Sequence, residues 1–152
     1  MRLRAWLVSG AMAAAGLLTA QPAMAAQAVV GFYADSGDQC LRGVTEGTLE
    51  WVEGPVVRPT VKVDGYLADE ASISPCSTDG MYSTATFSAY KGSSLVDSET
   101  AKADNGKVAL SFALSDPAGV TTIDRVVVQV CRFSSTPVGT SYCGKAAEYK
   151  AP

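Results

Sequence analysis

The chain of 152 residues contains no histidine. This absence excludes Ser-His-Asp and Cys-His catalysis, histidine-ligated metals and imidazole acid–base chemistry, which all need the ring. The sequence also lacks a Walker loop, a GxGxxG fingerprint and any CxxC pair, so it offers no familiar nucleotide loop and no paired-thiolate zinc site. We therefore expect no cofactor and no bound metal.

Helical periodicity is the second missing feature. After residue 25 no helix-period stripe exceeds two turns, whereas apolar and polar residues alternate with period two in run after run. Turn-forming sequences separate these runs, as at Gly54-Pro55 and Asp104-Asn105-Gly106. The expected strands are 28–34, 48–52, 57–67, 81–90, 95–99, 107–114, 123–133 and 138–149, with irregular stretches at 35–47 and 68–80.

Seven or eight short strands predict an all-β fold, an antiparallel β-sandwich with immunoglobulin-like architecture or a small barrel. Trp51 follows Cys40 by eleven residues, as a core tryptophan would. Tyr142, however, lies immediately before Cys143, one place from the position of the tyrosine in immunoglobulin domains. The sequence therefore predicts the architecture and does not assign the family.

Residues 1–25 have the features of a cleavable secretory signal peptide. Arg2 and Arg4 precede an uncharged, largely apolar stretch, and Ala23-Met24-Ala25 forms a small-x-small cleavage site. The stretch of about 16 apolar residues is shorter than the roughly 20 that cross a bilayer, so a membrane anchor is the weaker alternative. We expect a mature chain of residues 26–152 that forms one β domain, secreted into the medium or a bacterial periplasm.

The mature chain is acidic. Without the two leader arginines it has 10 basic and 15 acidic residues, a net charge of −5. Nucleic acid is therefore excluded as an expected partner, and the mature form is expected to have no membrane span. A chain of this length can bury a core by itself, so we expect a monomer.

Four cysteines remain in the mature chain, an even number that predicts two disulfides in an exported protein. Three pairings are possible. Cys131 and Cys143 lie symmetrically about Pro137, so a hairpin turning there would place them opposite each other on paired strands. The remaining bridge would then join Cys40 to Cys76.

Two groups of side chains could support chemistry. Glu46, Glu50 and Glu53 surround Trp51, which could stack on a sugar ring, and paired carboxylates are what glycoside hydrolysis needs; the alternative is an edge strand with solvent-facing acids. Asp35-Ser36-Gly37-Asp38 resembles the start of a calcium loop but lacks its later ligands, and a turn before Cys40 explains it equally well.

Two sets of residues are candidates for binding. Tyr66, Tyr82 and Tyr90 fall on the polar sides of their strands and could form a shared face, although surface tyrosines are common on strands. The loop from Arg132 to Tyr142 could contact a partner because a bridge and Pro137 would limit its conformational freedom. Its expected contact residues are Phe133, Pro137 and Tyr142; the alternative is a bridge that only secures a terminal hairpin.

The sequence thus favours a secreted, non-catalytic binding protein whose partner is an extracellular protein or polysaccharide, in the manner of an envelope component or an inhibitor of a secreted enzyme. Two alternatives stay open. One is a small extracellular hydrolase that uses two carboxylates, and the other is a structural envelope component.

Overall fold

The structure is a computed structural model that describes residues 26–38, 42–54, 57–70 and 80–152. Every regular element in these ranges is a strand. They are β1 (Ala26–Asp35), β2 (Gly43–Gly54), β3 (Val57–Asp69), β4 (Met81–Lys91), β5 (Ser94–Ala103), β6 (Gly106–Ser115), β7 (Arg125–Ser134), β8 (Tyr142–Cys143) and β9 (Ala147–Lys150). The prediction of an all-β fold is confirmed.

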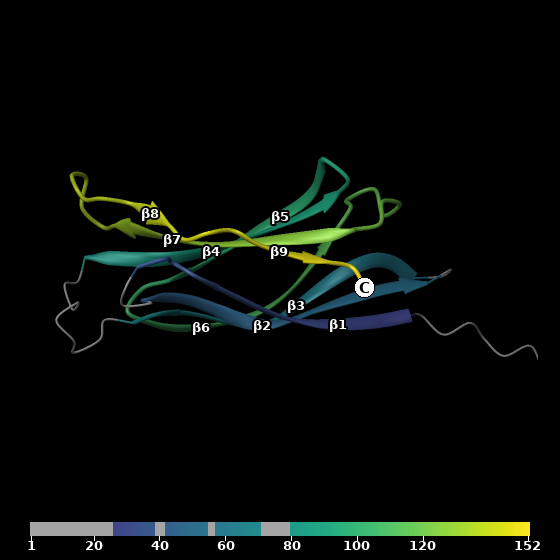
Figure 1. Cartoon of the computed structure of the whole chain (residues 1–152), viewed down its shortest axis with the longest axis horizontal. Coiled ribbons are helices and arrows are strands. Elements are labelled where there is room, and N and C mark those ends of the chain that lie inside the picture. Colours follow the sequence, from purple (N-terminus) through teal and green to yellow (C-terminus); the bar gives the residue numbers. More distant parts are fainter. Residues whose placement is uncertain (1–25, 39–41, 55–56, 71–79) are drawn as a thin grey trace, which may run out of the picture.

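The strands form two antiparallel sheets that lie face to face (Figure 1). The first sheet has the order β1-β2-β3-β6, and the second has the order β5-β4-β7-β8, with β9 also paired to β7. The chain passes between the sheets after β3, β5 and β6. This arrangement is sandwich-like, and it brings strands that are distant in sequence into one core.

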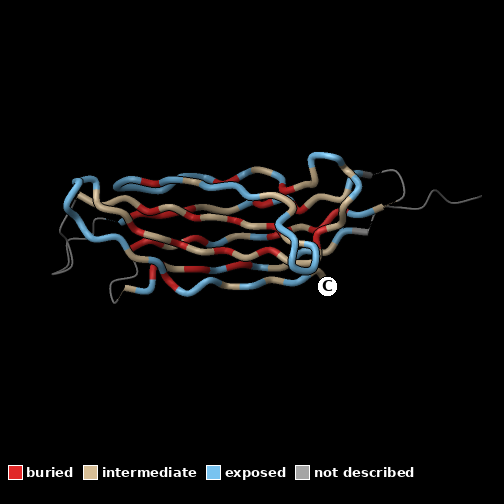
Figure 2. Tube along the Cα trace, turned by 90° about the horizontal axis from the view of Figure 1, so that it is seen from above, coloured by how far each residue is buried: buried red, intermediate tan, exposed pale blue. Residues whose placement is uncertain are grey.

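Side chains at alternate positions fill the space between the sheets, and Figure 2 shows these buried positions recurring along the central strands. Phe87 lies at the centre and packs edge-on against Phe32 and Phe112, each with a ring-centroid distance of 5.3 Å. The fully buried positions recur at alternate positions of their strands, as the period-two pattern of the sequence indicates; they include Val61, Val63, Leu67, Ala85, Phe87, Ala89, Leu114, Val126 and Val128.

Several strands are longer than predicted, such as β5, and at two places a close contact of a glycine explains the difference. The stretch 35–47 is not wholly irregular, because β2 begins at Gly43 and runs through Gly47. A side chain at Gly47 would lie 2.1 Å from the carbonyl oxygen of Asp64, so glycine here permits close pairing with β3. The expected strand 138–149 is two short strands, interrupted where the Cα of Gly144 lies against the carbonyl of Asp35 and leaves no room for a side chain.

The disulfide between Cys131 and Cys143 is confirmed. The two residues are register partners on β7 and β8, with a Cα–Cα distance of 3.9 Å. Cys40 and Cys76 lie outside the described residues, so the second predicted bridge stays a prediction.

Candidate binding surfaces

A buried ion pair joins the two sheets at the base of the loop between β7 and β8. The Arg132 Nη2 on β7 lies 3.2 Å from the Asp69 Oδ1 on β3, and both side chains are at most 2% exposed. The Ser83 hydroxyl donates to the same carboxylate oxygen at 2.5 Å, and the Asn105 backbone N–H donates to the other at 3.0 Å. These three contacts to the Asp69 carboxylate compensate for the burial of its charge and fix this end of the sandwich.

Tyr142 points inward from the loop and is not one of its exposed residues. Its hydroxyl donates to the Asp38 Oδ2 at 3.1 Å, which ties β8 to the segment after β1. Burial raises the pKa of the Tyr142 hydroxyl, and the negative charge of Asp38 acts in the same direction. Tyr142 therefore anchors the loop.

The tip of the loop is exposed and uncharged. Ser135 is held by its backbone N–H and its hydroxyl, which both donate to the Gly80 carbonyl, at 2.6 and 2.8 Å. Beyond it Pro137 is exposed, and Val138 is 95% exposed, the highest value among the large apolar side chains of the described ranges. Figure 1 shows this loop at the end of the sandwich opposite the start of β1. The bridge, the ion pair and Tyr142 thus support a loop that presents one apolar side chain.

The three solvent-side tyrosines do not form one face. Tyr82 and Tyr90 lie on the outer surface of the second sheet, whereas Tyr66 lies on the outer surface of the first. Each ring is covered by a cation from a neighbouring element: Lys102 over Tyr82 at 3.7 Å, Lys107 over Tyr66 at 3.5 Å, and Arg125 over Tyr90 at 4.5 Å. The prediction of a shared face is therefore wrong for Tyr66, and cation–π contacts between neighbouring strands account for all three rings.

Phe133 and Tyr82 are brought together by the pairing of β7 with β4. Their rings are stacked with centroids 5.6 Å apart. With Lys102 on the tyrosine, this cluster is a half-buried patch beside the disulfide. Of the predicted contact residues, only Pro137 lies at the exposed tip itself.

Glu46, Glu50, Glu53 and Trp51 do not converge. Trp51 is a core residue between the sheets, so the idea that it stacks on a sugar from solvent is wrong. Glu46 and Glu50 lie on the outer face, four residues apart on one strand, which separates their Cα atoms by about 14 Å, wider than the 5 to 9.5 Å between the carboxyls of glycosidases. Glu50 forms an ion pair with Lys62 at 3.3 Å.

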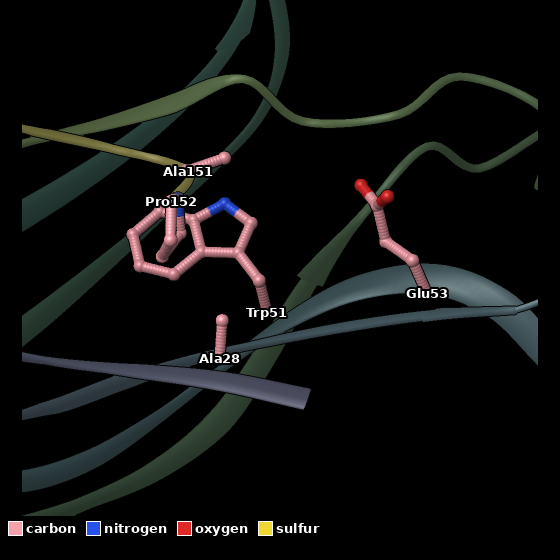
Figure 3. Close-up of a pocket in the computed structure, with 5 residues that line it drawn as sticks. All are labelled: Ala28, Trp51, Glu53, Ala151 and Pro152. Carbon is pink, nitrogen blue, oxygen red and sulfur yellow. The ribbon is translucent and has the colours of Figure 1, made fainter. Parts of the chain in front are cut away.

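The Trp51 indole lines a hollow of about 120 Å³, together with Glu53, Ala28, Ala151 and Pro152 (Figure 3). Among the residues that the structure describes, its buried N–H finds no hydrogen-bond partner. In Figure 3 the Glu53 carboxylate stands apart from the indole, across the hollow. A space of this size holds a few water molecules.

The segment Asp35 to Asp38 forms a hydrogen-bonded turn. The Asp35 Oδ1 accepts from the Gly37 backbone N–H at 2.8 Å, and the Asp38 Oδ2 accepts from the Ser36 hydroxyl at 2.6 Å. Within the described ranges, no three acidic or cysteine side chains group as metal ligands. These contacts match the alternative of a turn before Cys40.

A candidate that the sequence analysis missed lies along the outer face of the first sheet, beside β1. The Tyr66 hydroxyl donates to the Glu46 Oε1 at 2.5 Å, and this bond raises the pKa of Tyr66. Tyr33 on β1 is the register partner of Glu46 on its other side. A shallow hollow of about 350 Å³ opens beside these residues, over Thr48 and the Gly47–Gly65 pair. Tyr33, Glu46 and Tyr66 lie side by side because β1 pairs with β2 and β2 pairs with β3.

Comparison with known proteins gives no relative: no family model matches the chain, and neither a curated protein nor a solved structure matches it. In the ranges that the structure describes, no helix has the length and apolar character to cross a membrane.

Proposed function

We propose that the mature protein, residues 26–152, is an exported, monomeric, non-catalytic binding protein that acts outside the cytoplasm and contacts a partner protein through the loop between β7 and β8. Export is supported by the leader sequence and by a disulfide that needs an oxidising compartment. The absence of histidine and the separation of the acids around Trp51 favour binding over catalysis. We also keep as proposals the immunoglobulin-like strand arrangement and the second bridge, between Cys40 and Cys76.

One observation carries the proposal: Val138 is almost fully exposed at the tip of a loop whose base is fixed on three sides. The Cys131–Cys143 bridge, the Arg132–Asp69 ion pair and the Tyr142–Asp38 hydrogen bond all lie below the tip. A fixed loop loses little conformational entropy on binding. An exposed apolar side chain on such a loop is suited to fill a pocket on a partner.

We expect Val138→Asp to weaken partner capture at least tenfold without changing stability, because Val138 is exposed and a buried carboxylate would be costly in an apolar pocket. The measurement is capture from culture supernatant on immobilised mature protein, quantified by mass spectrometry, beside a thermal melt. The matched control is Val120→Asp, since Val120 is 79% exposed on another loop. Equal capture by the parent and Val138→Asp, or by a variant with Ser134 to Thr140 replaced by Asn-Gly, would show that the loop only closes a hairpin.

We expect the mature protein to begin at Ala26. Ala23 and Ala25 occupy the −3 and −1 positions of the small-x-small site, and β1 begins directly after it. N-terminal sequencing of the exported protein measures this. A sequence that starts at Met1, or beyond Val30 within β1, contradicts the assignment.

A further inference from the structure

β1 is an edge strand of the first sheet, and part of its backbone has no partner within the described ranges. In an antiparallel pair, alternate residues turn both N–H and C=O away from the neighbouring strand. The Tyr33 N–H donates to the Tyr149 hydroxyl at 2.8 Å, and this hydroxyl donates to the Tyr33 carbonyl at 2.6 Å. The backbone N–H and C=O groups of the odd-numbered residues of β1 therefore point away from β2, toward the open edge. Beyond Tyr33, Gly144 covers Asp35. The backbone groups of Gln27, Val29 and Gly31 have no hydrogen-bond partner in the described part of the chain.

This edge lacks the features that normally prevent strand addition. From Ala26 to Ala34 it has no charge and no proline, and its register with β2 is unbroken by a bulge. Val29 is 63% exposed on the outer face. Natural edge strands are usually protected by one of these devices, so an unprotected edge of this length indicates a docking site for another strand.

Charge on the adjacent outer face indicates which strand would dock. Three acids, Asp35, Glu46 and Glu50, lie on the outer face of β1 or of the adjacent β2, and the ion pair with Lys62 neutralises Glu50. On the outer face, Gly31 lies between Val29 and Tyr33 on β1, and Thr48 is its register partner on β2. Because both residues are small, they leave a shallow groove that leads to the hollow beside Glu46. A long basic side chain from an added strand would fit along this groove. A second copy of β1 would instead repeat the same acids against each other.

We propose that β1 accepts, by strand addition at Gln27, Val29 and Gly31, an extended segment of a partner protein whose alternate side chains are basic. The backbone of the segment pairs with the three open residues, and a lysine or arginine opposite Gly31 extends over Thr48 toward Glu46. This surface is separate from the loop that carries Val138, so the two proposals fail independently.

The probe is the blocked peptide acetyl-Thr-Arg-Val-Arg-Val-Arg-Thr-amide, titrated against the mature protein by calorimetry. We expect it to bind at least tenfold more tightly than its counterpart with glutamate in place of each arginine. A third peptide has the same composition but contains its arginines in one block, and it tests whether binding needs basic side chains at alternate positions. Hydrogen exchange should slow at the amides of Val29 and Gly31 only with the first peptide.

Val29→Pro is the decisive variant because it removes the Val29 backbone N–H, which points to the open edge and does not bond β2. Proline is tolerated at such a position of an edge strand. We expect it to abolish binding, whereas Val29→Thr keeps the N–H and binds like the parent. Ala113→Pro, on the opposite edge of the same sheet, is also expected to bind the peptide like the parent. Glu46→Gln is expected to lose the preference for the arginine peptide over the glutamate peptide.

Three results would overturn the proposal. They are equal binding of the arginine and glutamate peptides, parent-like binding by Val29→Pro, and a dimer in sedimentation experiments that Val29→Pro abolishes, since the last would make a second copy the occupant. The Val138→Asp variant should bind the peptide normally, which separates this test from that of the loop.

Discussion

Replacing Asp69 by asparagine is expected to lower the free energy of unfolding by about 3 to 5 kcal/mol, a large part of the stability of a domain this size. The substitution keeps the shape of the side chain and an oxygen that can accept from Ser83. It removes the negative charge that faces the Arg132 guanidinium 3.2 Å away, in a place where neither side chain meets solvent. An uncompensated buried cation is the source of the cost. Urea unfolding of the parent and the variant measures it.

The exposed ion pair between Glu50 and Lys62 provides the control. Its 3.3 Å separation is almost the same, but its side chains are 23% and 47% exposed. Glu50→Gln is therefore expected to cost less than about 1 kcal/mol, because water already screens the pair. If both substitutions cost the same, burial is not what makes the Asp69–Arg132 contact matter.

Removing the bridge by the double substitution Cys131→Ser and Cys143→Ser is expected to cost about 3 kcal/mol. The bridge spans a sequence separation of 12, and on the chain-entropy model its effect comes from restricting the unfolded chain. The measurement is again urea unfolding, with the reduced parent as a second reference. A cost near zero would mean that Arg132 and Tyr142 hold the hairpin without the bridge. Peptide mapping without reduction on the same parent sample tests the linkage of Cys40 to Cys76.

The variant without the bridge also bears on the proposed loop function. If the bridge aids binding by fixing the loop between β7 and β8, the variant without the bridge should capture the partner less well than the parent, even under conditions in which the variant is fully folded. Unchanged capture by the folded variant would separate the role of the bridge in stability from any role in binding.

Period-two alternation predicted most of the strands and their inward faces, because burial on one side of a sheet imposes that period on the sequence. It failed where backbone contacts rather than side chains set the boundary. From the sequence, Gly47 was placed in an irregular stretch, yet it lies within β2. Glycine is needed there because β3 approaches too closely to leave room for a side chain. Gly144 interrupts the last strand for the same reason, through a contact with Asp35 more than a hundred residues away.

The candidate sites were less predictable than the fold. The symmetric spacing of Cys131 and Cys143 was sufficient to predict their bridge, since a hairpin is a local structure. No sequence signal, by contrast, indicated that Lys107 covers Tyr66 or that Asp69 meets Arg132, because these pairs join different strands. Tyr142 was expected to contact a partner, but the contact with Asp38 turns it inward.

The sequence by itself determined the strand content, the inward faces, the bridge near the C-terminus and the absence of histidine chemistry. These are local properties, or properties of composition, that any fold of this chain would share. The tertiary structure decided which strands became edges, which charges became buried and which tyrosines acquired a cation. Each of these depends on the order of strands in the two sheets. The backbone of Gln27, Val29 and Gly31 is open because β2 lies on one side of β1 and none of the strands in the described ranges lies on the other.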